Sequence, residues 1–240
     1  IDRGYIFKKK YLKILQKYID HISFETIQIV DLAKKNYDFL SNKVFLVTNG
    51  IDEKYVKRLN LENNTYEDKL NIITYVARIG IYEKNTEFFL EVLEKLNLDN
   101  TWKVHILGSI EEEFKLKIEN FYKKNNHLIT KIIFHGNISS RKTLYDYYSK
   151  SKIFCLTSRT EGFPLVFPEA IYFGNYIVTT DVSGAKDITS NEKYGTIVRS
   201  NNANDYANIV NNLISSDNLN KELSDSIKVF AKKNYTWQSI

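Results

Sequence analysis

Two glutamates, Glu161 and Glu169, lie eight positions apart across the junction of two apolar segments. Residues 153–156 form a short apolar run that predicts a buried strand, and an amphipathic run ending at Gly174 predicts a helix. In parallel α/β sheets, ligands bind where a strand leads into a helix, because exposed N–H groups and the helix dipole attract an anion there. Carboxylates beside that anion suit hydroxyl groups of the same ligand. The pattern therefore predicts a ligand with an anionic part and an uncharged, hydroxyl-rich part.

Pro168 indicates where the predicted helix begins. A proline in a helix interior costs about 3 kcal/mol, but it costs little in the first turn, where its missing N–H has no partner to lose. We therefore expect the helix to start a few residues before Pro168. Glu169 would then lie in the first turn, and Glu161 in the preceding loop on the other side of the crevice.

Cations and glycines follow other apolar runs. Arg78 and Lys84 come after the run at 72–77, and Gly108 and Gly136 come after the next two runs. Because parallel strands end at one edge of their sheet, we expect a cleft there with cations on one side and carboxylates on the other. A diphosphate would lie between Arg78 and Lys84, since both side chains bind phosphate oxygens. Taken singly, each of these charges is also explained as a solvated surface group.

Short apolar runs alternate with helical segments over most of the chain. The runs are β-branched, aromatic and apolar at consecutive positions, which is typical of strands buried on both faces. Strict alternation of strands and helices predicts an α/β fold with a parallel sheet and right-handed crossovers. The predicted strands are 44–47, 72–77, 104–107, 132–135, 153–156, 176–179 and 196–198, and the predicted helices are 84–97, 110–125, 141–150, 166–173 and 203–215.

The composition excludes several classes of protein. The chain has 240 residues, 26% of them charged, and a net charge of +5, which favours a solvated surface over a binding site for nucleic acid. It has no apolar run of about 18 residues, as a membrane-spanning helix would need. Its one cysteine, Cys155, is expected in the core. Of the four histidines, which lack metal-ligand spacing, only His135 ends a strand beside the predicted cleft.

The N-terminal part of the chain has a different pattern. Residues 3–20 alternate lysines with apolar residues at helical spacing, which predicts a basic surface helix, with contact to an anionic membrane as the alternative. Residues 26–40 predict a second helix. The chain begins at Ile1 and has no methionine, so we expect it to be part of a longer protein.

Several motifs follow one another in an order that resembles a known family. The similarity is to the nucleotide-sugar-binding C-terminal half of GT-B-fold, retaining glycosyltransferases of family 4, over roughly residues 43–230. Ala77 departs from the pattern, which has a glycine before the arginine. The matching segments are Asn49-Gly50-Ile51-Asp52, Arg78-Ile79 with Lys84-Asn85, Phe134-His135-Gly136-Asn137, Glu161 and Glu169 as an E-x7-E signature, 174–184 and 194–198.

The resemblance implies a role for each residue of the cleft. Arg78 and Lys84 would bind the donor diphosphate, Glu161 the transferred sugar and Glu169 the ribose. Backbone groups after Glu161 would bind phosphate and sugar oxygens, and those around His135 would frame the base. The implied catalytic residue is Glu161, and the implied donor-binding residues are Arg78, Lys84, Glu169, Gly162, Phe163, Pro164, Leu165, Val166, His135, Gly136, Asn137 and Ile138, with no metal ligand.

The resemblance also implies an organisation and an activity. Residues 1–42 would end the acceptor domain and its linker, 43–230 would form the Rossmann-like donor domain, and 231–240 would start a C-terminal crossover helix. The expected activity is hexosyl transfer with retention, in polysaccharide biosynthesis. The expected donor is a nucleoside diphosphate sugar, with UDP-sugar favoured, and the expected acceptor is a glycan or a lipid-linked molecule. No cofactor is expected. The expected location is the cytoplasm, with the inner face of the membrane as the alternative, and the fragment alone is expected to be inactive. The alternatives are a GT-B-fold nucleotide-sugar epimerase and a non-catalytic nucleotide-sugar-binding module.

Overall fold

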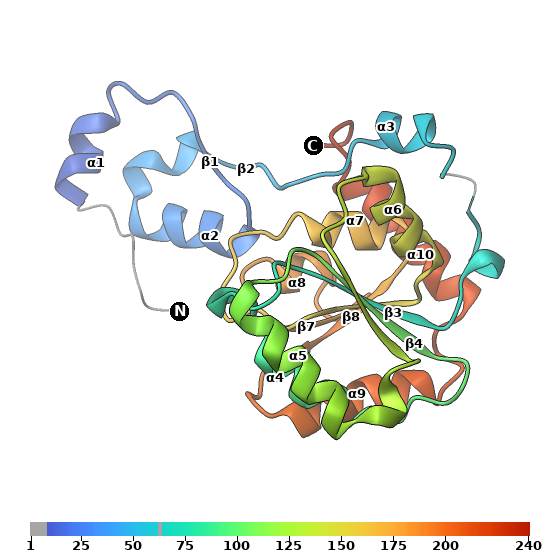
Figure 1. Cartoon of the computed structure of the whole chain (residues 1–240). Coiled ribbons are helices and arrows are strands. Elements are labelled where there is room, and N and C mark those ends of the chain that lie inside the picture. The colour runs from blue at the N-terminus through green and yellow to red at the C-terminus, as the bar shows by residue number, and fades with distance from the viewer. Residues whose placement is uncertain (1–8, 62–63) are drawn as a thin grey trace. The chain divides into compact units, whose positions relative to one another are not determined.

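The computed structural model describes residues 9–61 and 64–240, and the chain divides into two compact units, 1–48 and 49–240 (Figure 1). The predicted boundary fell between residues 42 and 43. The observed division comes later because the run at 44–47, predicted as the first strand of the large sheet, pairs with a strand of the first unit instead.

The first unit is a small α/β arrangement. Helix α2 packs against a parallel pair of strands through a core that includes Val30 and Val44. The helix predicted at 26–40 ends at Asn36 and is followed by a 3-10 helix, whereas residues 3–8 of the predicted basic helix lie outside the described residues. The elements are α1 (Lys9–Leu15), β1 (Ile22–Phe24), α2 (Ile27–Asn36), η1 (Asp38–Lys43) and β2 (Val44–Leu46).

The second unit is built on a six-stranded parallel sheet in the order β5-β4-β3-β6-β7-β8 (Figure 1). The six predicted strands of this region are confirmed. Central strands such as β3 and β6 are buried on both faces, which explains their consecutive apolar residues. The strands are β3 (Ile72–Val76), β4 (Lys103–Leu107), β5 (Ile132–Gly136), β6 (Ile153–Leu156), β7 (Tyr176–Thr180) and β8 (Gly195–Val198).

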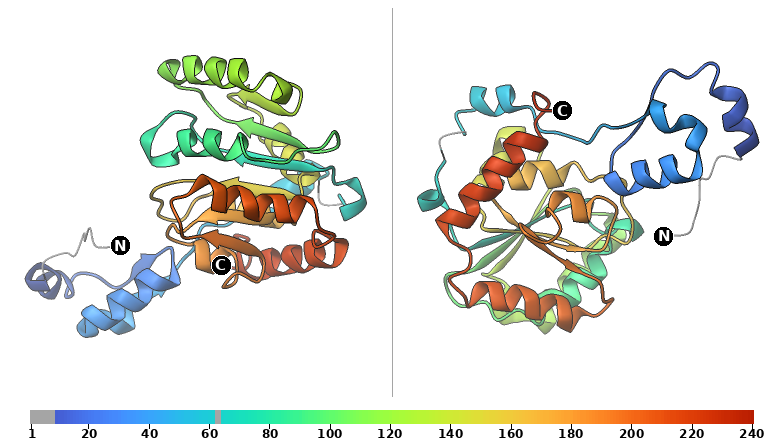
Figure 2. Two further views of the ribbon diagram at one scale, coloured as in Figure 1. Left: turned by 90° about the horizontal axis from the view of Figure 1, so that it is seen from below. Right: turned by 180° about the vertical axis from the view of Figure 1, so that it is seen from behind.

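Helices cover both faces of this sheet (Figures 1 and 2). One hydrophobic core joins the sheet to α4, α5 and α9, and a second core joins its other face to α6, α7, α8 and α10. The helices are α3 (Glu53–Arg58), α4 (Thr86–Leu93), α5 (Glu112–Lys124), α6 (Arg141–Lys150), α7 (Val166–Tyr172), α8 (Ala185–Ile188), α9 (Ala203–Ile214) and α10 (Lys221–Asn234), with 3-10 turns η2 (Tyr66–Asp68), η3 (Tyr82–Lys84) and η4 (Asn126–Leu128).

Two ends of helices differ from the sequence predictions. Helix α4 begins at Thr86 rather than at residue 84, because Asn85 adopts a left-handed conformation (φ 52°) between η3 and α4. Residues 231–234 form the last turn of α10 rather than the start of a new helix. Two residues beyond the end of α10, Thr236 forms an isolated parallel bridge with Ile51.

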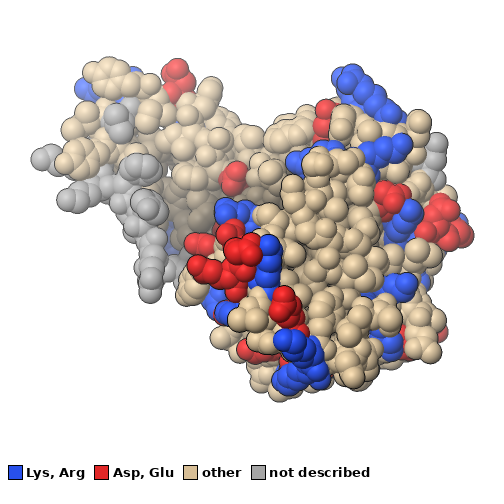
Figure 3. All heavy atoms as spheres, in the orientation of Figure 1, with Lys and Arg blue, Asp and Glu red and all other residues tan. Residues whose placement is uncertain are grey.

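Among the described residues, no helix has both the length and the apolar character needed to cross a bilayer. Figure 3 shows Lys and Arg side chains interleaved with Asp and Glu over the visible face of the second unit. This mixture agrees with the mild net charge of +5.

Candidate functional site

The strand order creates a crevice at the carboxyl edge of the sheet. From β3 the chain moves outward to β4 and β5, then returns to the other side of β3 as β6 and continues to β8. The loops after β3 and β6 therefore leave the sheet in different directions, as at the ligand-binding switch point of open α/β folds. A cleft of about 490 Å³ lies here, lined by Val76, Ala77, Arg78, Lys84, Leu107, Gly108, Ser109, Asn137, Ile138, Leu144, Leu156, Glu161, Phe163, Pro164, Leu165 and Val166.

Lys84 reaches across the crevice from the β3 side. The Tyr75 hydroxyl donates to the Lys84 carbonyl at 2.9 Å, and the Thr157 hydroxyl donates to the same oxygen at 3.3 Å, so both strands hold this backbone. The Lys84 Nζ then donates to Oε1 of Glu161 at 2.6 Å. The lysine side chain is one-quarter exposed, and the ion pair therefore forms at the wall of the cleft rather than in open solvent.

Glu161 is held from the β6 side. The Ser158 hydroxyl donates to the same Oε1 at 2.6 Å, and the carboxylate side chain is only 10% exposed. The loop that carries it is anchored twice: the Arg159 N–H donates to the Glu83 carbonyl at 2.8 Å, and the Asn49 side-chain amide donates to the Phe163 carbonyl at 2.8 Å. These contacts leave the carboxylate fixed beside the cation and facing the cleft.

Arg78 borders two hollows. It lines the cleft of about 490 Å³, called the main cleft below because Lys84 and Glu161 also line it. It lines as well a second hollow of about 560 Å³ that includes Glu111, Glu112 and Glu113. Its side chain is two-thirds exposed, and one guanidinium nitrogen donates to Oε1 of Glu111 at 3.1 Å. In this structure the arginine is therefore engaged by Glu111, a carboxylate that lines the second hollow and not the cleft that Glu161 lines.

The backbone at the floor of the cleft is tightly packed. The Ala77 N–H donates to the Leu107 carbonyl at 3.0 Å, and the Gly108 N–H donates to the Gly136 carbonyl at 2.9 Å. Gly108 has a φ of 137°, and a Cβ there would lie 1.7 Å from the Ala77 carbonyl oxygen. Only glycine fits this close approach, which keeps the ends of β3 and β4 side by side.

Glu169 lies behind the wall of the cleft rather than in its lining. Its side chain is 8% exposed, its Oε1 accepts a hydrogen bond from Arg141 at 2.5 Å, and its Oε2 accepts one from the Tyr148 hydroxyl at 3.2 Å. Burial raises the pKa of the Glu169 carboxyl above its ordinary value, although Arg141 and Tyr148 act in the opposite direction. The carboxylate is thus buried in a polar cluster provided by α6.

The expected position of the helix that carries Glu169 is confirmed. Helix α7 starts at Val166, so that Pro168 and Glu169 both lie in its first turn. The amino terminus of this helix has no side-chain cap. Because α7 has only seven residues, its dipole is short, and the positive charge of the cleft comes mainly from Arg78 and Lys84.

Three predicted residues besides Glu169 do not line the cleft, namely Gly162, His135 and Gly136. The His135 ring instead stacks on His105, with Nε2 of His135 and Nδ1 of His105 at 2.7 Å, and its Nδ1 is 3.2 Å from the Tyr147 hydroxyl. Burial lowers the pKa of His135, and burial together with His135 lowers the pKa of His105 to about 4. The His135 side chain is therefore used within this cluster, whereas its neighbours Asn137 and Ile138 border the cleft.

Three residues of the site were not predicted from the sequence: Arg141, Glu111 and Ser158. Each binds one of the predicted charged groups, and the two partners of each contact are 3 to 33 residues apart in the sequence. One signal was present for Arg141. It is the first residue of α6, where a cation is unfavourable beside the positive end of the helix dipole. Such a residue requires a partner that compensates it.

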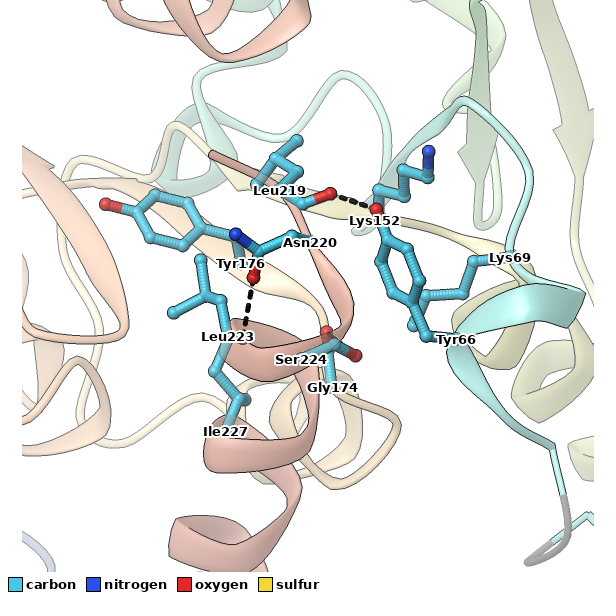
Figure 4. A pocket seen from close by; sticks show the side chains of 10 residues that line it. All are labelled: Tyr66, Lys69, Lys152, Gly174, Tyr176, Leu219, Asn220, Leu223, Ser224 and Ile227. Carbon is cyan, nitrogen blue, oxygen red and sulfur yellow. Dashed lines mark hydrogen bonds between the residues drawn. The ribbon is translucent and has the colours of Figure 1, made fainter. Parts of the chain in front are cut away.

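A smaller hollow lies at the opposite, amino-terminal edge of the sheet (Figure 4). It holds only about 10 Å³, which is room for about one water molecule. Lys69 borders it and donates to the Ser151 carbonyl at 2.5 Å, and burial together with Lys228 and Lys152 lowers the pKa of Lys69 well below its ordinary value. The size of this hollow excludes a ligand as large as a nucleotide.

Comparison with known proteins identifies the family. Residues 56–230, well over half of the chain, match the family described as "Glycosyl transferases group 1". The chain belongs to this family. The matched region contains every residue that lines the main cleft.

Bacterial glycosyltransferases are among the similar proteins. The chain is 27% identical over 192 residues to "GalNAc-alpha-(1->4)-GalNAc-alpha-(1->3)-diNAcBac-PP-undecaprenol alpha-1,4-N-acetyl-D-galactosaminyltransferase" of Campylobacter jejuni, a match of 73% of this chain and 50% of that protein. It is 26% identical over 208 residues to the amylovoran biosynthesis glycosyltransferase AmsD of Erwinia amylovora, covering 84% and 56%. The chain thus spans about half the length of these curated relatives.

Solved structures show the same fold. A glycosyltransferase from Rickettsia africae superposes with a TM-score of 0.78 at 20% identity, over 100% of this chain and 65% of that one. TarM of Staphylococcus aureus, solved with UDP and other ligands, gives a TM-score of 0.73 at 22% identity, over 100% and 46%. At these identities the likeness establishes the fold of this group 1 chain, a parallel sheet between helices as in GT-B glycosyltransferases.

Proposed function

We propose that this chain carries the donor site of a retaining hexosyltransferase that uses a nucleoside diphosphate sugar. The observation that carries the proposal is the cleft at the topological switch point, where Lys84 and Arg78 lie on the β3 side and Glu161 faces Lys84 at 2.6 Å from the β6 side. A diphosphate supplies the anion for the two cations, and a sugar supplies hydroxyl groups for the carboxylate.

The main electrostatic task of such an enzyme is to stabilise the leaving group. When the bond between the sugar and the diphosphate breaks, negative charge develops on the nucleoside diphosphate. Lys84 has three N–H donors and can keep one on Glu161 while offering the others to phosphate oxygens. Arg78 can leave the exposed Glu111 and place its planar fork on the diphosphate.

Glu161 is suited to act on the sugar. Its carboxylate is held by Lys84 and Ser158 through one oxygen, Oε1, so that Oε2 can accept hydrogen bonds from the transferred sugar. A fixed negative charge beside the reacting carbon would also stabilise an oxocarbenium-like transition state. Retention of configuration is part of the proposal through the resemblance to family 4.

The remaining predicted roles concern the nucleoside. Asn137 and Ile138 border the cleft where the base would lie, and Glu169 comes three residues after the cleft residue Val166 in α7, with a carboxylate that the ribose hydroxyls would reach. Ribose binding through Glu169 requires its carboxylate to be shared between Arg141 and the ribose hydroxyls, because Arg141 already binds Oε1 in this structure.

Transfer is favoured over epimerisation because the relatives described above are named as transferases. The name of the Campylobacter protein includes an undecaprenol-linked glycan, which supports a glycan or lipid-linked acceptor here as well. We place the reaction in the cytoplasm, at the inner face of the membrane when the acceptor is lipid-linked. The chain alone, which spans about half of those relatives, is expected to bind the donor without transferring its sugar.

A panel of nucleotides tests the proposal. The thermal unfolding of the chain is measured with UDP, GDP and ADP and with their sugar derivatives, and UDP compounds are expected to raise the midpoint most. A ligand at 100 times its dissociation constant adds about 2.7 kcal/mol to the free energy of unfolding, which in a chain of this size is a shift of several degrees. No shift with any nucleoside diphosphate or nucleotide sugar would overturn the proposed donor site.

Replacement of Glu111 is expected to strengthen nucleotide binding. In the Glu111→Gln variant Arg78 loses its exposed ionic partner, so the guanidinium is more available to a diphosphate. Exposed ion pairs contribute about 0.2–1 kcal/mol, so the dissociation constant for UDP should fall by about 1.5-fold to 5-fold. Glu113→Gln makes the same change in net charge in the same hollow and serves as the control in the calorimetric titration. Weaker binding by Glu111→Gln would contradict this role for Glu111.

A further inference from the structure

Arg141 occupies a position that helix electrostatics disfavours. It is the first residue of α6, and the first turn of that helix contains no acidic residue. A cation beside the positive end of a helix dipole costs free energy unless another group compensates it. Its guanidinium is half exposed, so solvent would be available to it, yet it turns inward to Glu169 at 2.5 Å.

Glu169 is the carboxylate that needs this cation. With 8% of its side chain exposed, it would be disfavoured in the charged form, because burial removes the water that stabilises the negative charge. All of its hydrogen-bond partners in the described structure come from one helix: Arg141 binds Oε1, and the Tyr148 hydroxyl binds Oε2. Of these two groups, only Arg141 carries a charge that favours the carboxylate over the carboxylic acid.

The structure points to Arg141 as a positioning residue of the donor site. It keeps the buried Glu169 carboxylate ionised and oriented toward α6, so that this carboxylate can accept hydrogen bonds from the ribose hydroxyls. The part that concerns ribose rests on the proposed function. The part that concerns ionisation rests on this ion pair alone. Neither the E-x7-E signature nor any predicted site residue includes Arg141.

The neighbouring charged groups do not replace Arg141. On α6, Tyr145 also acts on the Glu169 carboxyl, and the Arg141 guanidinium lies 5.9 Å from the centre of the Tyr145 ring. The charged groups of other elements near α7 act on other partners. On α10, Lys232 lies over the Tyr172 ring and Lys228 donates to the Asn64 carbonyl, and Glu53 of α3 accepts from the Tyr172 hydroxyl. On α8, Asp187 acts on Tyr235 and Lys186 acts on Glu192.

The direction of the pH effect follows from burial. The pKa of Glu169 is already raised in the folded chain, and loss of Arg141 raises it further. Ionisation of Glu169 then opposes folding. This penalty is absent below the pKa of Glu169 in the unfolded chain, about 4.3. It grows as the pH rises toward the pKa of Glu169 in the folded chain and is complete above that value. In the Arg141→Gln variant the penalty at pH 8 is therefore larger than in the unmodified chain.

The first experiment needs no ligand. Thermal midpoints from pH 5 to pH 8.5 are compared for the unmodified chain, Glu169→Gln, Arg141→Gln and the double variant. Glu169→Gln should raise the thermal midpoint more at pH 8.5 than at pH 5. This increase with pH should be about 2–4 °C larger when Arg141 is also replaced by glutamine than when Arg141 is present. Equal growth in both backgrounds would overturn the role of Arg141 in ionisation. Should Arg141→Gln not fold, Arg141→Met, which keeps the aliphatic stem, takes its place.

The second experiment measures UDP binding by calorimetry over the same pH range. At each pH the dissociation constant of a variant is divided by that of the unmodified chain, and this ratio cancels the titration of UDP itself. Hydrogen bonds to charged groups are stronger than those to neutral groups by about 1 kcal/mol. The ratio for Arg141→Gln should therefore be about fivefold higher at pH 6 than at pH 8.5. Arg141→Lys should restore a flat ratio. A flat ratio in Arg141→Gln would overturn the inference about ribose.

A matched control separates this role from the loss of any surface arginine. Arg199 is half exposed like Arg141 and pairs with Glu192 at 2.7 Å, but Glu192 is 37% exposed. Arg199→Gln should leave both pH profiles unchanged, because solvent already stabilises the Glu192 carboxylate. If UDP fails to bind the unmodified chain, the proposed donor site fails, whereas the ligand-free experiment still decides whether Arg141 controls Glu169.

Discussion

Replacement of Lys84 by methionine is expected to weaken the binding of UDP by about 10-fold to 150-fold. The Lys84 Nζ is the less exposed of the two cations that line the cleft, and hydrogen bonds to charged groups contribute about 1.5–3 kcal/mol. The variant also leaves the Glu161 carboxylate, whose side chain is 10% exposed, facing the diphosphate without its counter-ion, which adds repulsion. Calorimetric titration with UDP measures the change.

Lys221→Met is the control for Lys84→Met. Lys221 forms an ion pair with Glu67 at 2.9 Å in which both side chains are about 60% exposed, at a position that does not line the cleft. The two variants make the same change in net charge, so only the position differs. Equal affinity of Lys84→Met and Lys221→Met for UDP would show that Lys84 does not bind the diphosphate.

Replacement of Glu161 by glutamine is expected to lower turnover by about 100-fold to 1,000-fold in a protein that contains both halves of the fold, a loss typical of removing one preorganised electrostatic group. The binding of UDP should not weaken, because the glutamine releases Lys84 for the diphosphate. A kinetic assay gives kcat for the transfer, and calorimetry gives the affinity for UDP.

The contrast between the two measurements is what identifies Glu161. A residue that only supports the loop would lower the affinity for UDP and kcat together, because Ser158 and Lys84 would shift with it. Turnover within threefold of the unmodified enzyme would remove Glu161 from the reaction. A loss of UDP affinity equal to the loss of turnover would assign it to binding.

Periodicity and local chemistry were sufficient to predict the six-stranded sheet and the start of α7. Consecutive β-branched and aromatic residues specify doubly buried strands such as β3 and β6, and Pro168 can lie only near the start of its helix. The run at 44–47 has the same composition, yet β2 pairs with β1 in the first unit. Strand partners are chosen by contacts distant in the sequence, which a single apolar run does not encode.

The candidate site divides in the same way. Residues at the ends of strands, such as Arg78 and Lys84, could be placed from the order of the elements, since parallel strands end at one edge. Their partners could not be placed so readily, because Glu111 and Arg141 come from other loops and reach the site only through side-chain packing. The side chain of His135 illustrates the limit. Its position at the end of β5 was predicted, but its contact with His105 depends on the pairing of β5 with β4, which a single apolar run does not specify.

The most direct test of the account is a crystal structure of the chain with bound UDP. We predict that the diphosphate lies in the cleft of about 490 Å³, with its oxygens within 3.2 Å of the Lys84 Nζ and the Arg78 guanidinium, and with the uracil beside Asn137 and Ile138. We also predict that Arg78 has left Glu111. UDP bound outside this cleft, or bound inside it with neither Lys84 nor Arg78 in contact with a phosphate oxygen, would contradict the assignment of this cleft as the donor site.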